Sequence, residues 1–98
     1  MKPIYNPSMA KVVLTTNLRK YTGGITETEA QGATVRELLH DLEEKVPGLR
    51  AYVVNETGAL RRHVNVFVDG ELVADRAALS DALRPDSVVH ILQALSGG

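Results

Sequence analysis

The sequence contains no cysteine, so disulfide bonds, thiolate metal sites and cysteine nucleophiles are all excluded. It has no tryptophan, one phenylalanine and three tyrosines, which leaves few aromatic rings on which bases could stack. The sequence has eleven lysine and arginine residues and twelve aspartate and glutamate residues, which gives a net charge of −1. Because there is no basic excess to hold a phosphate backbone, we expect no nucleic-acid partner.

Long apolar runs are missing as well. No stretch approaches the ~20 apolar residues of a membrane span, and the N-terminus lacks the apolar segment of a signal peptide. We therefore expect no membrane partner and a cytoplasmic location. Residues 1–9 contain two prolines and are predicted to be a flexible extension. Residues 10–93 are predicted to form a single domain, followed by a flexible tail at residues 94–98.

The clearest predicted element is an amphipathic helix that starts near residue 35 and ends at Pro47-Gly48. Thr34 and Glu37 have the spacing of a capping box, in which the hydroxyl and the carboxylate each accept a bond from an unpaired backbone N–H. The apolar residues recur at the spacing of one helical stripe, which predicts a single buried face. The stripe consists of Val35, Leu38, Leu39, Leu42 and Val46.

Two strands are predicted before this helix. Ala10–Leu18 is rich in β-branched residues, which favour strands. Gly23-Gly24 marks a turn, and Ile25–Gly32 then alternates threonine with glutamate. Two strands joined by a glycine-containing loop predict a hairpin.

Three more strands are predicted after the helix. His63–Val68 alternates, with its valines on one face and Asn65 and Phe67 on the other. Asp69-Gly70 has the composition of a type I′ turn, which leads into a short strand over residues 71–73. Residues 76–86 are expected to hold one helical turn, and Ser87–Gln93 is the last strand.

The order is therefore strand, strand, helix, strand, short strand, strand. This order predicts an α+β domain with a mixed sheet and one main helix, which can bury its stripe only against one face of that sheet. The layout is that of the β-grasp, or ubiquitin-like, fold. Asn55–Gly58 is predicted to be a turn, and the residues around it give no clear pattern.

No catalytic or metal site is predicted within the domain. The histidines lack metal-ligand spacing, and the serines lack the sequence context of an activated nucleophile. We interpret these side chains as surface or structural residues. They are His40, His63, His90, Ser80, Ser87 and Ser96.

The remaining candidate is the Gly97-Gly98 pair that follows the last strand and the short segment 94–96. Glycine has no Cβ, so its backbone can approach another surface closely and adopt angles closed to other residues. Such a segment suits passage through a narrow channel, with a terminal carboxylate delivered to chemistry on a partner. From the glycines alone, a frayed end is an equally good interpretation.

Taken together, these features resemble the ThiS/MoaD family of ubiquitin-like sulfur carriers. The resemblance runs from about Ala10 to Gly98 and rests on "YTGG", "TVRELLHDLEEKVPG", "HVNVFVDGE" and "DSVVHILQALSGG". The overall length and the stretch "LRRHVNVFVDGE" are most similar to the cysteine-biosynthesis type of carrier.

The resemblance implies that Gly98 is the working residue. A ubiquitin-activating-like adenylyltransferase would use ATP to adenylate the Gly98 carboxylate, and a persulfide protein would convert it to a thiocarboxylate. A biosynthetic enzyme would then accept the sulfur. On this hypothesis the chain supplies no catalytic residue and binds no cofactor. Gly97, Ser96, Leu95 and Ala94 form the threading segment, with Leu95 as an anchor, and Phe67 and Leu92 lie on the docking surface.

Three alternatives stay open at this point. The chain could be the small subunit of molybdopterin synthase, which uses the same chemistry. It could be a ubiquitin-like modifier whose Gly98 is joined to lysine by an isopeptide bond. It could also be a β-grasp interaction module with an inert tail. The sulfur acceptor is equally open, because the synthesis of cysteine, thiamin, molybdopterin or a thioacid natural product can use such a tail.

Overall fold

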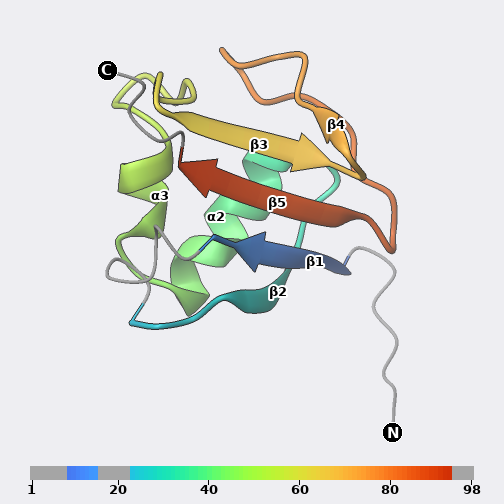
Figure 1. Ribbon diagram of the computed structural model, residues 1–98. Coiled ribbons are helices and arrows are strands. Elements are labelled where there is room, and N and C mark those ends of the chain that lie inside the picture. Colours follow the sequence, from blue (N-terminus) through green and yellow to red (C-terminus); the bar gives the residue numbers. More distant parts are fainter. Residues whose placement is uncertain (1–8, 16–22, 94–98) are drawn as a thin grey trace, which may run out of the picture.

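A computed structural model of the chain describes residues 9–15 and 23–93 (Figure 1). The predicted tail and most of the predicted N-terminal extension lie outside these ranges. The described elements are β1 (Met9–Leu14), β2 (Glu27–Gln31), α2 (Val35–Lys45), α3 (Leu49–Val53), β3 (Val64–Val68), β4 (Glu71–Leu72) and β5 (Val88–Gln93).

The five strands form one mixed sheet in the order β2-β1-β5-β3-β4. β1 and β5 are parallel neighbours at its centre, and the other pairs are antiparallel. The predicted hairpin of the first two strands and the predicted mixed sheet are both confirmed. β1 and β2 are shorter than predicted, since Thr15, Ile25 and Thr26 lie outside the strands.

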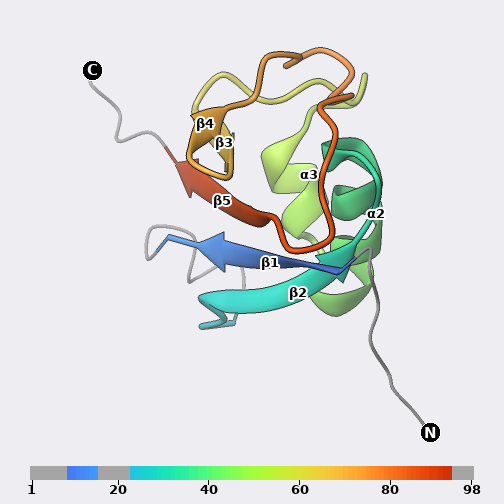
Figure 2. The same cartoon turned by 90° about the vertical axis from the view of Figure 1, so that its right-hand side faces the viewer.

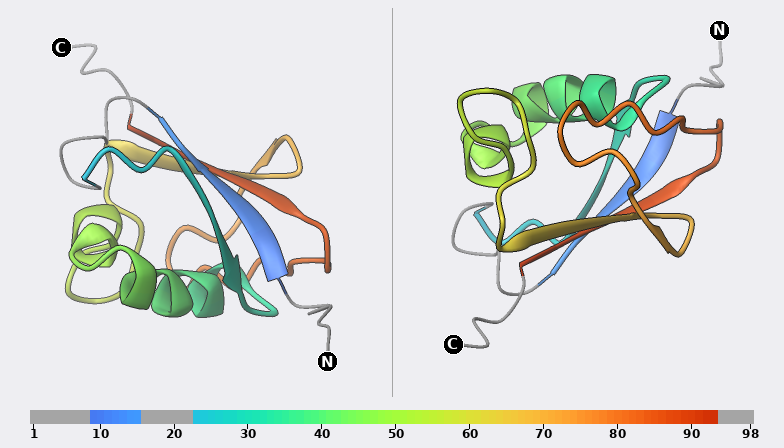
Figure 3. Two further views of the ribbon diagram at one scale, coloured as in Figure 1. Left: turned by 90° about the horizontal axis from the view of Figure 1, so that it is seen from below. Right: turned by 90° about the horizontal axis from the view of Figure 1, so that it is seen from above.

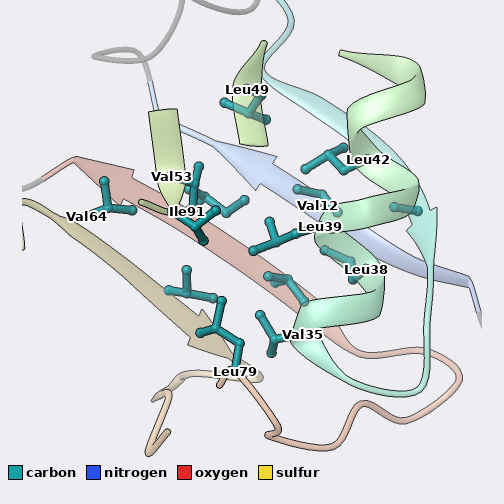
Figure 4. Close-up of a cluster of buried hydrophobic side chains, with 14 of the residues drawn as sticks. Val12, Val35, Leu38, Leu39, Leu42, Leu49, Val53, Val64, Leu79 and Ile91 are labelled. Carbon is teal, nitrogen blue, oxygen red and sulfur yellow. The ribbon is translucent and has the colours of Figure 1, made fainter. Parts of the chain in front are cut away.

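α2 and α3 cover one face of the sheet, as the side view shows (Figure 2). Figure 1 looks onto the opposite face, which we call the outer face and over which no described helix lies. The core between the layers is entirely aliphatic. Val12 and Ile91 from the two central strands meet the leucines of α2 there (Figure 4). None of the described helices is long and apolar enough to cross a bilayer.

α2 forms as predicted. All five residues of the predicted stripe are buried. The backbone N–H of Glu37 donates to the Thr34 hydroxyl at 3.2 Å, so the hydroxyl half of the predicted capping box is present. The Glu37 carboxylate accepts from the N–H of Ala33, one residue before the N-cap Thr34, at 2.8 Å. Gly32 connects β2 to this helix so closely that a Cβ on it would lie 2.5 Å from the backbone nitrogen of Leu38.

α3 was not predicted. Gly48 precedes it in the left-handed conformation, with φ of 94°. The Glu43 carboxylate reaches across from α2 and accepts from the backbone N–H groups of Gly48 and Arg50, at 2.9 and 3.0 Å. These bonds lower the pKa of Glu43, the one from Gly48 most. The unpaired N–H groups at the start of α3 are therefore bound by a carboxylate from the preceding helix.

The turn from β3 to β4 confirms the sequence prediction. Asp69 and Gly70 have φ of 51° and 88°, so both lie in the left-handed region that a type I′ turn requires. Residues 76–86 contain no assigned helix. The expected helical turn is reduced to one hydrogen bond from Leu79 N–H to the Asp75 carbonyl, because Leu79 then turns left-handed with φ of 54°.

Candidate functional site at the end of strand β5

The candidate functional residues follow β5 directly. Gly98, Gly97, Ser96, Leu95 and Ala94 lie outside the described residues, so their roles in activation and threading stay predictions. The structure describes the strand that leads into them and the surfaces around that strand. These surfaces determine how a partner could approach the tail.

β5 is held by both of its neighbours. It pairs in parallel with β1, where Leu14 lies opposite Ile91, and antiparallel with β3, where Val64 lies opposite Gln93. Val89 and Ile91 point into the core and are fully buried. The chain therefore enters residues 94–98 from a backbone position fixed at the centre of the sheet.

The start of β5 is fixed by a hydrogen-bond network around one buried hydroxyl, that of Ser87. Ser87 is 2% exposed and is the only buried polar residue in the described part of the chain. Its hydroxyl donates to Asp69 at 2.8 Å and accepts from the Arg84 N–H at 2.8 Å. The other Asp69 oxygen accepts from the Val88 N–H at 2.9 Å. The Val88 bond and then the Ser87 bond lower the pKa of Asp69, so its ionised form is favoured.

An apolar patch lies on the outer face beside β5. Phe67 is paired with Leu72 on β4 and with His90 on β5, and His90 is in turn paired with Val13 on β1. Residues paired across a sheet share a face, and Leu92 joins them because it lies two residues beyond His90. We call these five residues the outer-face patch. Leu72 is 52% exposed, and the other four are half-buried.

This placement bears on the two predicted docking residues. Phe67 and Leu92 belong to the outer-face patch and are not in the aliphatic core. Sequence reasoning missed Leu72, His90 and Val13. The Asp69-Gly70 turn contained the signal for Leu72, because a two-residue hairpin places residue 72 opposite residue 67.

The serines Ser80 and Ser87 take part in hydrogen bonds that stabilise loops. The Ser80 hydroxyl donates to Asp75 at 2.5 Å, and the same aspartate accepts from the N–H groups of Ala77, Ala78 and Ser80. Ser80 and the buried Ser87 thus each close a loop through an aspartate. Among residues 9–15 and 23–93, no three histidine or acidic side chains lie close enough together to hold a metal ion.

A mixed sheet packed against one long helix defines a ubiquitin-like β-grasp domain. In this chain the sequence continues from the central strand to a Gly-Gly pair. Residues 12–98 match the ThiS family. The chain belongs to this family.

Known relatives agree with this assignment. The chain is 34% identical over 89 aligned residues to sulfur carrier protein CysO of Mycobacterium tuberculosis. The alignment covers 89% of this chain and 96% of the relative. The Amycolatopsis orientalis BexX/CysO complex contains a similar chain, with a TM-score of 0.80 and 36% identity over 91% of this chain and 99% of that one. Small archaeal modifier protein 1 of Methanosarcina acetivorans is similar at a TM-score of 0.76 and 25% identity, covering 95% of this chain and 99% of that one.

Proposed function

We propose that this protein is a sulfur carrier that holds sulfur as a thiocarboxylate on Gly98 and supplies it for cysteine biosynthesis. One observation carries the proposal. The family match extends through the Gly97-Gly98 pair, and relatives named sulfur carrier protein CysO align with most of the chain. In the sequence, the Gly-Gly pair follows the central strand β5 after three intervening residues.

The chemistry starts from a poor electrophile. A carboxylate resists attack at neutral pH, so an activating enzyme first transfers AMP from ATP to Gly98 and releases pyrophosphate. The terminal sulfur of a protein persulfide then attacks the carbonyl carbon, and AMP leaves with the bonding electron pair. A second thiol cleaves the S–S bond of the resulting acyl disulfide. This step leaves the thiocarboxylate on Gly98 and a disulfide on the donor side.

The domain contributes binding and no reactive group in this scheme. The thiocarboxylate is a soft nucleophile and needs no cysteine in the carrier, which agrees with a sequence that has none. The acid, base and ATP site belong to the partners. Ala94, Leu95 and Ser96 pass through the partner's channel, and Leu95 anchors them in a groove.

The outer-face patch is proposed as the surface on which the activating enzyme docks. Its apolar side chains lie on β5 and the neighbouring strands, and Leu72 on the edge strand β4 is the most exposed of them. An ion pair between Lys11 and Glu27, at 3.0 Å, borders the patch on the β1 and β2 side. An apolar centre with a polar border is the usual anatomy of a protein interface.

A reconstituted reaction tests the proposal. The protein is incubated with its activating enzyme, ATP and a persulfide donor, and the product is treated with a sulfonyl azide that reacts with thiocarboxylates. We expect the full-length protein to be tagged and a variant lacking Gly98 to stay untagged. Equal tagging of the two, or none with an activating enzyme proven active, would overturn the proposal.

A second candidate is a protein modifier, and the similarity to small archaeal modifier protein 1 favours it. A modifier also needs adenylation of Gly98, but its carbonyl ends in an isopeptide bond to lysine. Conjugates of higher mass, detected in cells with an antibody to this chain and absent without Gly98, would establish that activity. The sulfonyl azide tag distinguishes the two, because an isopeptide contains no sulfur.

A further inference from the structure

Arg61, Arg62 and His63 form an exposed turn directly before β3, which we call the basic turn. Val64, the residue that follows it, is paired with Gln93, the last residue of β5. The basic turn therefore lies at the same end of the sheet as the root of the tail. Figure 3 shows the start of β3 beside the end of β5 from both directions.

The backbone of the basic turn is held firmly. The Arg61 N–H donates to the Val53 carbonyl at 2.9 Å, and the Arg61 side chain donates to the Ala51 carbonyl at 3.1 Å, so the turn is tied to α3. From the other side, the Arg76 guanidinium donates to the carbonyls of Arg61 and Val64, at 2.8 and 3.1 Å. A turn fixed in this way presents its side chains in a defined position.

The His63 ring is also fixed, since it packs edge-on against Tyr52 with ring centroids 5.6 Å apart. Arg62 differs from its neighbours. Within the described ranges, no hydrogen bond or ion pair of its side chain is seen, and the residue is exposed. An arginine held on a rigid turn without an internal partner is free to bind one on another molecule.

The surrounding charges leave a positive surplus at this end of the molecule. Arg50 and Arg61 line a shallow hollow together with one acidic residue, Glu56. A second carboxylate, that of Glu43, binds the backbone N–H groups at the start of α3 and keeps its charge. The arginines at this end, Arg50, Arg61 and Arg62, therefore exceed the acidic residues Glu43 and Glu56 by one. Other acidic side chains lie along α2. One of them, Asp41, accepts a hydrogen bond from the Gln31 N–H at the opposite end of the sheet, away from the basic turn.

The length of the tail decides what the basic turn can touch. The five residues after Gln93 can span at most roughly 17 Å, so Gly98 can reach a site well inside a partner while the basic turn stays at that partner's surface. The surface within reach is the protein surface around the mouth of the channel that receives the tail.

We propose that the basic turn is a second docking element, in which Arg62 contacts acidic side chains around the channel mouth of the activating enzyme. This inference rests on the proposed function. Opposite charges on the two surfaces steer the encounter and set the orientation in which the tail meets its channel. The outer-face patch supplies apolar contact area, and the basic turn supplies charge.

The test measures ATP–pyrophosphate exchange by the activating enzyme as the carrier concentration is varied. Arg62→Glu and Arg62→Gln are compared with Arg36→Glu. Arg36 is an exposed arginine in the first turn of α2, which follows β2 at the other end of the sheet, and its replacement changes the net charge by the same amount. All variants are first checked for an unchanged melting temperature.

We expect Arg62→Glu to raise the KM for the carrier about tenfold at low salt with kcat unchanged. Arg62→Gln should give a smaller rise, and Arg36→Glu should match the unaltered protein. The difference should shrink as salt is added, since exposed charge pairs are screened. If the unaltered protein supports exchange and Arg62→Glu has the same KM, the inference is wrong and the proposed function stands. If the unaltered protein supports no exchange, both are wrong.

Discussion

The two ends of β5 are built in opposite ways. At its start, the buried Ser87 and the exposed Asp69 form a hydrogen-bond network that joins the strand to the β3–β4 turn. At its far end, Gln93 pairs with Val64 of β3, and the sequence continues into the proposed reactive tail. The start of the strand is thus anchored by side-chain hydrogen bonds, while its far end is anchored by backbone pairing and lies beside the surfaces proposed to bind partners.

The largest expected effect comes from the tail. Deletion of Gly98 should abolish adenylation and sulfur loading, while Gly98→Ala should slow both, because a methyl group crowds the channel that accepts glycine. Neither change should alter the melting temperature, since the core lies within residues 10–91. Pyrophosphate exchange and thermal denaturation measure the two properties. If deletion of Gly98 unfolded the domain, the account in which the two ends of β5 serve stability and function separately would be contradicted.

Between the two ends, adjacent residues of β5 face opposite sides of the sheet. Ile91 is fully buried, so Ile91→Ala should lower the free energy of unfolding by about 2–5 kcal/mol through lost contacts and a cavity. Leu92 lies in the outer-face patch, so Leu92→Ala should cost less than about 1 kcal/mol. It should instead raise the KM for the carrier in the exchange assay. Urea denaturation gives the stabilities, and equal losses for both variants would contradict the assignment of faces.

At the start of β5, Ser87→Ala removes a buried hydroxyl. The Arg84 N–H loses its acceptor and Asp69 loses a donor, so we expect a loss of about 1–3 kcal/mol. Sulfur loading should be unchanged while the protein stays folded. Ser80→Ala is the matched control, because that hydroxyl also donates to an aspartate but is exposed. A similar loss in both variants would mean that burial of Ser87 adds nothing.

The smallest expected effect is on pH dependence. The pKa of Asp69 lies below its ordinary value of 3.8, mainly because of the Val88 N–H bond. Its contribution to stability is therefore complete above this value and is lost as the pH falls through the lower folded-state pKa. The melting temperature should fall below about pH 4, and less steeply in Asp69→Asn. An equally steep fall in Asp69→Asn would contradict this role for the Asp69 carboxylate.

Much of this fold was predictable from local pattern. The stripe and capping box of α2 and the Asp69-Gly70 turn each depend on residues within a few positions of one another. α3 could not be predicted, because five residues are too few to show a helical period. It also depends on a carboxylate from another helix, Glu43, at its start.

The candidate site was predictable to a different extent. The Gly97-Gly98 pair is visible in the sequence. Alternation in its own strand put Phe67 on the face opposite the valines, but the sequence left open whether that face was core or surface. Val13 joins the outer-face patch only through its pairing with His90, which is distant from it in the sequence. The position of Arg62 beside the root of the tail likewise requires the pairing of β3 with β5. Sequence alone does not specify such register.

The central claim is that Gly98 carries the sulfur while the domain only presents it. The most direct test is the intact mass of the protein after co-expression with its native genomic neighbours. Replacement of one oxygen by sulfur, mapped to the C-terminal peptide and absent from the variant lacking Gly98, is the predicted result. An unmodified mass, with the activating enzyme present and active, would contradict the account.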